Sequence, residues 1–308
     1  MRGMRVAMLV VALEAVAALF LVGSAWAQHG NGTYSESNSM ASDGADKLYV
    51  LYCGQGHTEG QERWSPGVFV GKPIDISDNC YLIHDNASGY FLWDTGISDY
   101  VASMPNGWQN GPLLWTRTKT LASQLAALHV DPSDIKLIGI SHTHPDHIGN
   151  AELFPQTKII MGKAEAAMYF GPKGFVQPTP GDPRPTFSKD HPLIKADEDY
   201  DAFGDGNIIV LATPGHTPGH QSALVHLKKT GWIILTGDAV HLQGNWDNRR
   251  VPAMGGEPDD VGIMIRKLQT LTSMQRLADL ISFYHAQLWI NHEMTQSAKR
   301  KMSPEFYE

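Results

Sequence analysis

The stretch from Ile135 to Asn150, IKLIGISHTHPDHIGN, constrains the fold of this chain more than any other segment. Its first half is a continuous apolar run, which is typical of a strand buried on both faces of a sheet. Four potential metal ligands follow directly: His142, His144, Asp146 and His147. Residues two apart in an extended backbone point to the same side, so this short segment can aim ligands at two neighbouring points. The stretch therefore predicts a metal site at the end of a buried strand.

Three later segments repeat the pattern of an apolar strand followed by a polar ligand. TPGHTPGH contains His216 and His220, LTGDA contains Asp238, and INHE contains His292. Histidine and carboxylate ligands favour Zn²⁺, with Mn²⁺ or Fe²⁺ as alternatives, whereas structural zinc prefers closed shells rich in cysteine. Two ions sharing one carboxylate would lie ~3.5–4 Å apart with a hydroxide between them. The pattern predicts a catalytic site for two metal ions.

Strands and helices alternate along the chain, which predicts an α/β domain over residues 47–308 with two similar halves, 47–200 and 201–308. Apolar runs predict strands at 47–54, 80–85, 90–96, 135–141, 158–162, 207–215, 222–227, 232–239 and 287–291. Residues 86–89 predict a hairpin turn between two of these strands. Helical spacing is found at 118–128, 151–154, 163–169 and 259–283. The last of these predicts an amphipathic helix with apolar positions Ile263, Ile265, Leu268, Leu271, Met274, Leu277 and Ile281.

The N-terminal residues show the pattern of a targeting segment. Arg2 and Arg5 precede an almost wholly apolar run, and Ala25-Trp26-Ala27 matches a secretory cleavage pattern. Residues 1–27 are therefore predicted to be a signal peptide, and the polar residues 28–46 a flexible tail. An uncleaved membrane anchor is the alternative, but the run is short for spanning a bilayer. We expect a secreted or periplasmic protein without a stable membrane anchor.

The net charge and the cysteine content indicate which partners and which covalent crosslinks to expect. The formal net charge is −8 and basic residues form no extended run, so we expect no nucleic-acid partner. The chain has two cysteines, Cys53 and Cys80, which fall in strand-like segments. In an oxidising compartment they could form a disulfide, and the alternative is two buried free thiols.

The motifs resemble those of the metallo-β-lactamase superfamily. HTHPDH matches its HxHxDH motif, and LWDTG, TPGHTPGH, LTGDA and the late His292 follow in the family's order. The resemblance implies an αβ/βα sandwich with the metal site at one edge of two facing sheets. It assigns His142, His144 and His216 to one ion, Asp146, His147 and His292 to the other, and Asp238 as a bridge. It also implies that Asp94 orients the site, while His220 and His129 are expected to be structural.

Within the superfamily, the chain is most similar to exported N-acyl-homoserine lactonases. The segments CYLIHDNASGYFLWDTGI, TPGHTPGHQSALV and NWDNRRVP carry this likeness. It implies attack of a metal-bridging hydroxide on a small acylated lactone, with Asp146 as proton donor. His241 stands where such lactonases commonly have tyrosine, so it is either a catalytic donor or the sign of another substrate. The aromatic residues expected either to line an acyl groove or to pack under their own loops are Trp108, Trp115, Phe170 and Phe175.

Other functions remain open on the sequence alone. A periplasmic β-lactamase of the same fold would suit an exported chain, and thioester or phosphotriester hydrolysis uses the same chemistry. A metal-binding module without activity would require a lost ligand, and none of the seven is missing. We also consider a homodimer.

Overall fold

The computed structural model describes residues 43–171, 183, 188–252 and 260–308. The chain divides into two units, residues 1–41 and 42–308, and all described residues belong to the second. The predicted signal peptide and most of the predicted tail lie outside the described residues, as does Phe175. Regular pairing begins at Ala45, which bridges to Leu227, two residues before the predicted start of the domain.

Two mixed sheets form the framework of this unit. The first sheet has the strand order β4-β5-β1-β2-β3-β6-β7-β8. Its strands are β1 Lys47–Thr58, β2 Ile74–Asp85, β3 Gly89–Trp93, β4 Trp108–Asn110, β5 Leu113–Thr116, β6 Ile135–Gly139, β7 Lys158–Gly162 and β8 Leu193–Ala196. The strands from β4 to β3 pair antiparallel, and β3, β6, β7 and β8 pair parallel.

The second sheet has the order β13-β12-β11-β10-β9. Its strands are β9 Tyr200–Asp201, β10 Ile208–Ala212, β11 Gln221–Leu227, β12 Gly231–Leu235 and β13 Gln287–Trp289. Only β12 and β13 pair parallel in this sheet, because α6 Asp260–Tyr284 provides the crossover between them. The two sheets correspond to the two halves predicted from the sequence.

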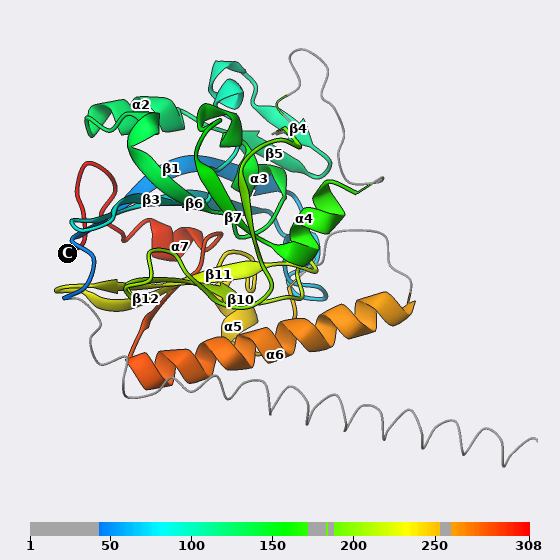
Figure 1. Ribbon diagram of the computed structural model, residues 1–308. Helices are drawn as coiled ribbons and strands as arrows, with labels where there is room; N and C mark the ends of the chain where they lie inside the picture. The colour runs from blue at the N-terminus through cyan, green and yellow to red at the C-terminus, as the bar shows by residue number, and fades with distance from the viewer. Residues whose placement is uncertain (1–42, 172–182, 184–187, 253–259) are drawn as a thin grey trace, which may run out of the picture. The chain divides into compact units, whose positions relative to one another are not determined.

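A shared apolar layer holds the sheets face to face (Figure 1). Val50 and Phe91 of the first sheet belong to the same buried cluster as Val225 and Leu235 of the second. Helices cover the outer faces. α2 Leu121–Ala127 and α4 Lys163–Tyr169 pack on the first sheet, and α6 packs on the second. The architecture is the predicted αβ/βα sandwich.

Short helices and turns complete the described structure. These are the helices α3 Pro145–Ile148, α5 Gln243–Asp247 and α7 Met294–Ser297, and the 3₁₀ turns η2 Gln61–Arg63, η3 Asp99–Ser103, η4 Pro132–Asp134 and η5 Ala151–Leu153. The helix predicted at 151–154 is thus a single 3₁₀ turn. The predicted strands and the hairpin turn at 86–89 are confirmed. No helix of the described residues is both long and apolar enough to cross a membrane.

The long helix α6 differs from the sequence expectation in its first half. Met274 and Leu277 are buried against the second sheet, as predicted. Ile265 and Leu268, however, are each 51% exposed, and Leu271 is 38% exposed. The N-terminal half of α6 reaches past the strands of the second sheet (Figure 1), and the described residues leave these three side chains partly uncovered. Periodicity identifies the apolar face of a helix but not how far its partner surface extends.

Cys53 and Cys80 form a disulfide bond between β1 and β2. The register of the two strands shifts between Tyr52 and Gly54, so Cys53 lies in a β-bulge, while Cys80 pairs with Leu51. Both residues are fully buried. The structure therefore selects the disulfide over the two free thiols.

Candidate metal centre

The segment after β6 places four candidate ligands around one turn. Ile140 and Ser141 leave the buried strand, and His144 caps the short helix α3 with Pro145 in its first turn. Proline suits this position because its fixed φ is already helical and the missing N–H has no helical partner. The turn of α3 then places Asp146 and His147 in a second group of candidate ligands, in which the ring of His147 lies 4.1 Å from that of His142.

Gly149 brings α3 close to the loop that follows β3. Its N–H donates to the carbonyl of Gly96. A Cβ at Gly149 would collide with the backbone of Gly96 and Ser98, so only glycine allows this approach. The contact places the DTG segment, which includes Asp94, directly beside the ligands of α3.

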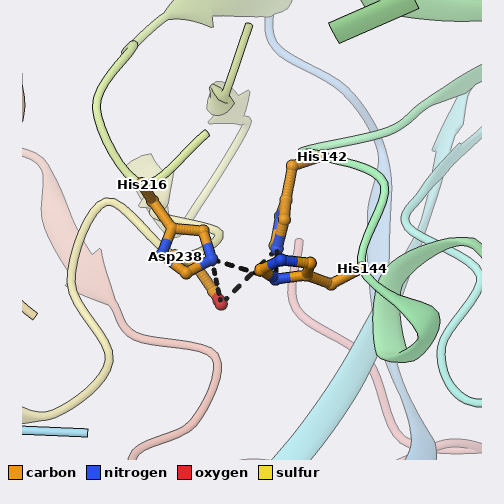
Figure 2. Close-up of side chains that lie close together, drawn as sticks. All are labelled: His142, His144, His216 and Asp238. Atoms are coloured by element: carbon orange, nitrogen blue, oxygen red, sulfur yellow. Dashed lines mark hydrogen bonds and ion pairs between the residues drawn. The ribbon is translucent and has the colours of Figure 1, made fainter. Parts of the chain in front are cut away.

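The remaining candidate ligands come from the second sheet. His216 lies between β10 and β11, Asp238 follows β12, and His292 follows β13. Potential ligand atoms within 4.8 Å of one another define two groups: His142, His144, His216 and Asp238, and Asp146, His147 and His292. Figure 2 shows the side chains of the first group converging on one point. The structure thus brings together all seven residues that the sequence pattern singled out.

The two carboxylate oxygens of Asp238 face different groups. Oδ2 lies 3.3 Å from His216 Nε2 and 3.6 Å from His142 Nε2. Oδ1 lies 3.1 Å from His292 Nε2 and 3.4 Å from His147 Nε2. This is the arrangement expected of a carboxylate that bridges two ions.

Several buried atoms in the centre lack a hydrogen bond of acceptable geometry. They are His147 Nε2, His292 Nε2, His241 Nε2 and Asp238 Oδ1. An unsatisfied buried polar atom costs roughly 1–3 kcal/mol, so such a concentration needs a compensating partner. Five histidines and two carboxylates form a donor set suited to divalent first-row ions. The residues therefore fit two metal ions.

Hydrogen bonds behind the candidate ligands fix their orientation. Asp94 Oδ2 accepts from His147 Nδ1 at 2.8 Å and from Ser141 Oγ at 2.9 Å, and its Oδ1 accepts the Ser141 N–H at 2.7 Å. His292 Nδ1 donates to the Ser77 carbonyl at 2.8 Å. Once a metal displaces the second proton, these bonds would keep a proton on Nδ1 of each ring and leave the Nε2 lone pair facing the centre. Asp94 has the position expected of it.

The charges of the centre perturb its pKa values in opposite directions. Burial lowers the pKa of His292, but Asp238 and Asp146 raise it more, to about 9. The pKa of His147 is raised well above its usual 6.5 because three carboxylates outweigh its burial. Burial and the neighbouring imidazole His147 hold the pKa of His142 well below 6.5. Burial works against ionisation of Asp238, yet the surrounding histidines keep its pKa well below 3.8. Metal binding must therefore displace protons from His147 and His292.

Comparison with known proteins agrees with this geometry. The sequence profile described as "Metallo-beta-lactamase superfamily" matches residues 75–285. The chain belongs to the metallo-beta-lactamase superfamily. Among curated relatives, the N-acyl homoserine lactonase AttM of Agrobacterium fabrum is 30% identical over 77% of this chain and 89% of its own length. AttM of Azorhizobium caulinodans is 31% identical over 77% and 90%, and AiiA of Bacillus thuringiensis subsp. kurstaki is 26% identical over 84% and 98%.

Solved structures share the superfamily fold. An N-acyl homoserine lactone hydrolase with N-hexanoyl-L-homoserine at its catalytic metal centre superposes with a TM-score of 0.70. It is 23% identical, and the match covers 86% of this chain and 100% of that one. AidC, a dizinc quorum-quenching lactonase, matches with a TM-score of 0.53 at 16% identity, over 86% and 97% of the two chains.

His220 positions a candidate ligand of this superfamily member, whereas His129 lies away from the centre. Buried His220 accepts the backbone N–H of Asp238 at 2.8 Å through Nε2, and its Nδ1 lies 3.0 Å from the Thr213 carbonyl. Burial lowers its pKa to about 3, so His220 stays neutral and keeps this role. His129 is exposed beyond α2, at a positive φ of 57°. Neither residue belongs to the candidate ligand groups.

Glu165, on α4, is a positioning residue that sequence reasoning missed. Its Oε1 accepts from the N–H of Thr143 at 2.8 Å and from Thr143 Oγ1 at 2.7 Å, and its Oε2 accepts from the N–H of Gly219 at 3.2 Å. The buried carboxylate thus connects the His142–His144 loop to the loop that carries His216. The available signal was an acidic residue in the first turn of a helix directly after the KIIMG strand.

Aromatic side chains pack against the centre on the side of η2. Trp64 packs edge-on against His241, with ring centroids 4.7 Å apart, and lies 5.0 Å from His292. Trp115 is buried 6.5 Å from His292, and Trp108 packs in the same cluster. Phe170 packs instead against the apolar core under the first sheet. This agrees with the second of the two expectations, in which it packs beneath its own loop rather than lining a groove. Sequence reasoning missed Trp64, because no local pattern connects η2 with the ligand segments.

Proposed function

We propose that this protein is a metal-dependent hydrolase that opens the lactone ring of N-acyl-homoserine lactones. The observation that carries the proposal is the combination of a seven-residue centre with curated relatives named as N-acyl homoserine lactonases, which match along 89–90% of their length. The proposed ligands are His142, His144 and His216 for one ion, Asp146, His147 and His292 for the other, and Asp238 for both. Zn²⁺ is the proposed metal, with Mn²⁺ and Fe²⁺ as alternatives, and elemental analysis of the purified protein tests this.

When bound, the ions would supply Lewis acidity and a water of lowered pKa as the nucleophile. The chain's own groups orient and protonate. Asp94 holds the ring of His147, and Ser77 holds that of His292, so that both rings keep one orientation. Asp146 Oδ2 lies 3.5 Å from His292 Nε2, at the edge of the centre. We assign to Asp146 the transfer of the nucleophile's proton to the ring oxygen as the acyl C–O bond breaks.

A substrate panel tests the proposal. Metal-loaded protein would be assayed against N-hexanoyl-homoserine lactone, nitrocefin, an aryl phosphotriester and a glutathione thioester. Lactone opening releases an acid, so a pH indicator detects it directly. Fastest turnover of the lactone supports the proposal, and turnover of nitrocefin without lactone opening would favour the β-lactamase alternative. Asp238→Ala should lose bound metal and activity together.

We further propose that the mature protein is secreted or periplasmic. The sequence of residues 1–27 and the Cys53–Cys80 disulfide support this, because disulfides are rare in the cytosol. N-terminal sequencing of protein from a fractionated host tests it, with Gln28 as the expected first residue.

A homodimer is part of the proposal too, supported by the exposed Met264, Ile265 and Leu268 of α6. Light scattering after size exclusion tests it.

A further inference from the structure

His241 lies inside the candidate metal centre without belonging to either ligand group. It follows Asp238 by three residues, and only 2% of its surface is exposed. Its Nε2 is 3.1 Å from Asp238 Oδ2, the oxygen that also faces His216 and His142. This distance falls within the range of 3.1–3.6 Å that separates Asp238 from the four imidazoles already assigned.

We propose that His241 is an additional metal ligand, which binds through Nε2 the ion nearest Asp238 Oδ2. The proposal rests on the proposed function for the existence of the two ions. It replaces the role as a substrate donor that the sequence suggested for this residue.

The hydrogen bonding of the ring supports a ligand and argues against a donor. His241 Nδ1 faces the backbone carbonyl of Trp64 at 3.4 Å, and a carbonyl only accepts. The proton of the neutral ring therefore resides on Nδ1, and Nε2 presents a lone pair to the centre. A lone pair cannot donate to the carbonyl oxygen of a substrate, as the hydroxyl of a tyrosine would. It can bind a cation.

The same signature marks two of the assigned ligands. His147, His292 and His241 each have a buried Nε2 without a hydrogen bond of acceptable geometry. In each case Nδ1 faces an acceptor outside the centre, which is Asp94, Ser77 or Trp64 respectively. Metal-binding histidines nearly always donate their other N–H to such an acceptor. By these criteria His241 differs from His147 and His292 only in the length of its outer contact, which is 3.4 Å rather than 2.8 Å.

The ring cannot turn away from the centre without disturbing its neighbours. The ring centroid of Trp64 lies 4.7 Å from that of His241 on one side, and the ring centroid of His216 lies 4.9 Å away on another. The backbone after His241 is fixed by Asn245, which accepts the N–H of Leu242 at 3.0 Å and donates to Ser65 at 3.0 Å. A preorganised imidazole costs little to recruit as a ligand.

A fourth imidazole would make the two ions unequal. The ion at Asp238 Oδ2 would have His142, His144, His216 and His241 around it, which approaches a closed shell. The ion at Asp238 Oδ1 keeps fewer protein ligands, and open positions are characteristic of a catalytic ion. Substrate contacts are therefore expected mainly on the side of Asp146.

Cobalt substitution tests the assignment directly. Protein stripped with a chelator and reloaded with Co²⁺ would be studied by proton NMR, in which the N–H of each cobalt-bound imidazole gives a strongly shifted, exchangeable signal. We expect wild type to show one more such signal than His241→Phe, and a competing chelator to remove one of the two ions from the variant at least about tenfold more readily. His226→Phe, which replaces a histidine stacked on Trp232 outside the centre, should match wild type in both measurements.

Each outcome decides a separate question. Equal signal counts and equal affinities in wild type and His241→Phe would overturn the assignment while leaving the two-ion centre intact. Wild type that binds fewer than two equivalents of Co²⁺ would overturn the centre itself. Circular dichroism of the metal-free variants checks folding, and His241→Gln provides a smaller substitution if His241→Phe fails that check.

Discussion

Opening the Cys53–Cys80 disulfide should lower the stability of the fold by an amount set mainly by the length of the loop it closes. The two residues are 27 apart in sequence, and they join β1 to β2 at the bulge of β1. The bond also lies against Gly96, where a Cβ would collide with Cys53. The disulfide therefore lies directly behind the segment that carries Asp94.

The loop length gives the expected magnitude. A crosslink over 27 residues removes chain entropy worth about 3.5 kcal/mol from the unfolded state at 25 °C. In a domain of this size, 1 kcal/mol changes Tm by about 2–4 °C, so the reduced protein should unfold about 7–14 °C lower. The effect acts mainly on the unfolded chain, so the native structure of the reduced protein should be preserved.

Urea denaturation of the metal-free protein with and without a phosphine reductant measures this difference on one sequence. Both cysteines are buried, so reduction must be carried out on the unfolded chain before refolding. A thiol titration confirms that the bond is open, and Cys53→Ala/Cys80→Ala provides a crosslink-free control. A difference in the free energy of unfolding below about 1 kcal/mol would refute the loop-entropy reasoning.

Four other perturbations have defined outcomes. Asp94→Asn should weaken metal binding by about 10- to 100-fold, because the amide offers His147 Nδ1 a poorer acceptor; chelator competition measures it. Glu165→Ala should also weaken metal binding while leaving secondary structure intact, since it frees the loops at Thr143 and Gly219; circular dichroism and metal titration separate the two effects. Removing metal should lower Tm by an amount that grows with the free metal concentration of the loaded reference, and a metal-independent Tm would contradict two tightly held ions. His220 has a folded pKa of about 3, below its ordinary 6.5, so its contribution is complete above pH 6.5 and is lost as pH falls toward 3. The stability gap between wild type and His220→Gln, both metal-free, should accordingly narrow from pH 7 to pH 5 in urea titrations.

The candidate ligands were predictable because they occur in short polar segments that follow apolar strands. The abrupt change from apolar to polar residues identifies His142, Asp238 and His292 as candidate ligands. The order of the motifs then indicates which ligands belong to the same ion. The two carboxylate oxygens of Asp238 face different histidines, and this geometry supports its proposed bridging role.

The remaining features depend on contacts that no local pattern encodes. Trp64 reaches the centre only because the β1–β2 connection folds over it, and Glu165 acts through two loops distant from it in sequence. The pairing of Cys53 with Cys80 depends on a one-residue bulge, which strand propensity cannot locate. The exposed first half of α6 depends on where the second sheet ends. Each of these is a property of tertiary packing rather than of sequence periodicity.

The distribution of the ligands also governs the lifetime of the folded protein. His142 to His147 form a local group, but His216, Asp238 and His292 reach the centre only after the second sheet has docked on the first. We predict that this docking, and with it the bridged centre, forms after the folding barrier, and interactions formed after the barrier slow unfolding without speeding folding. Metal removal should accordingly raise the unfolding rate and leave the folding rate unchanged. Bound ions would then stabilise the native state kinetically without taking part in the folding nucleus.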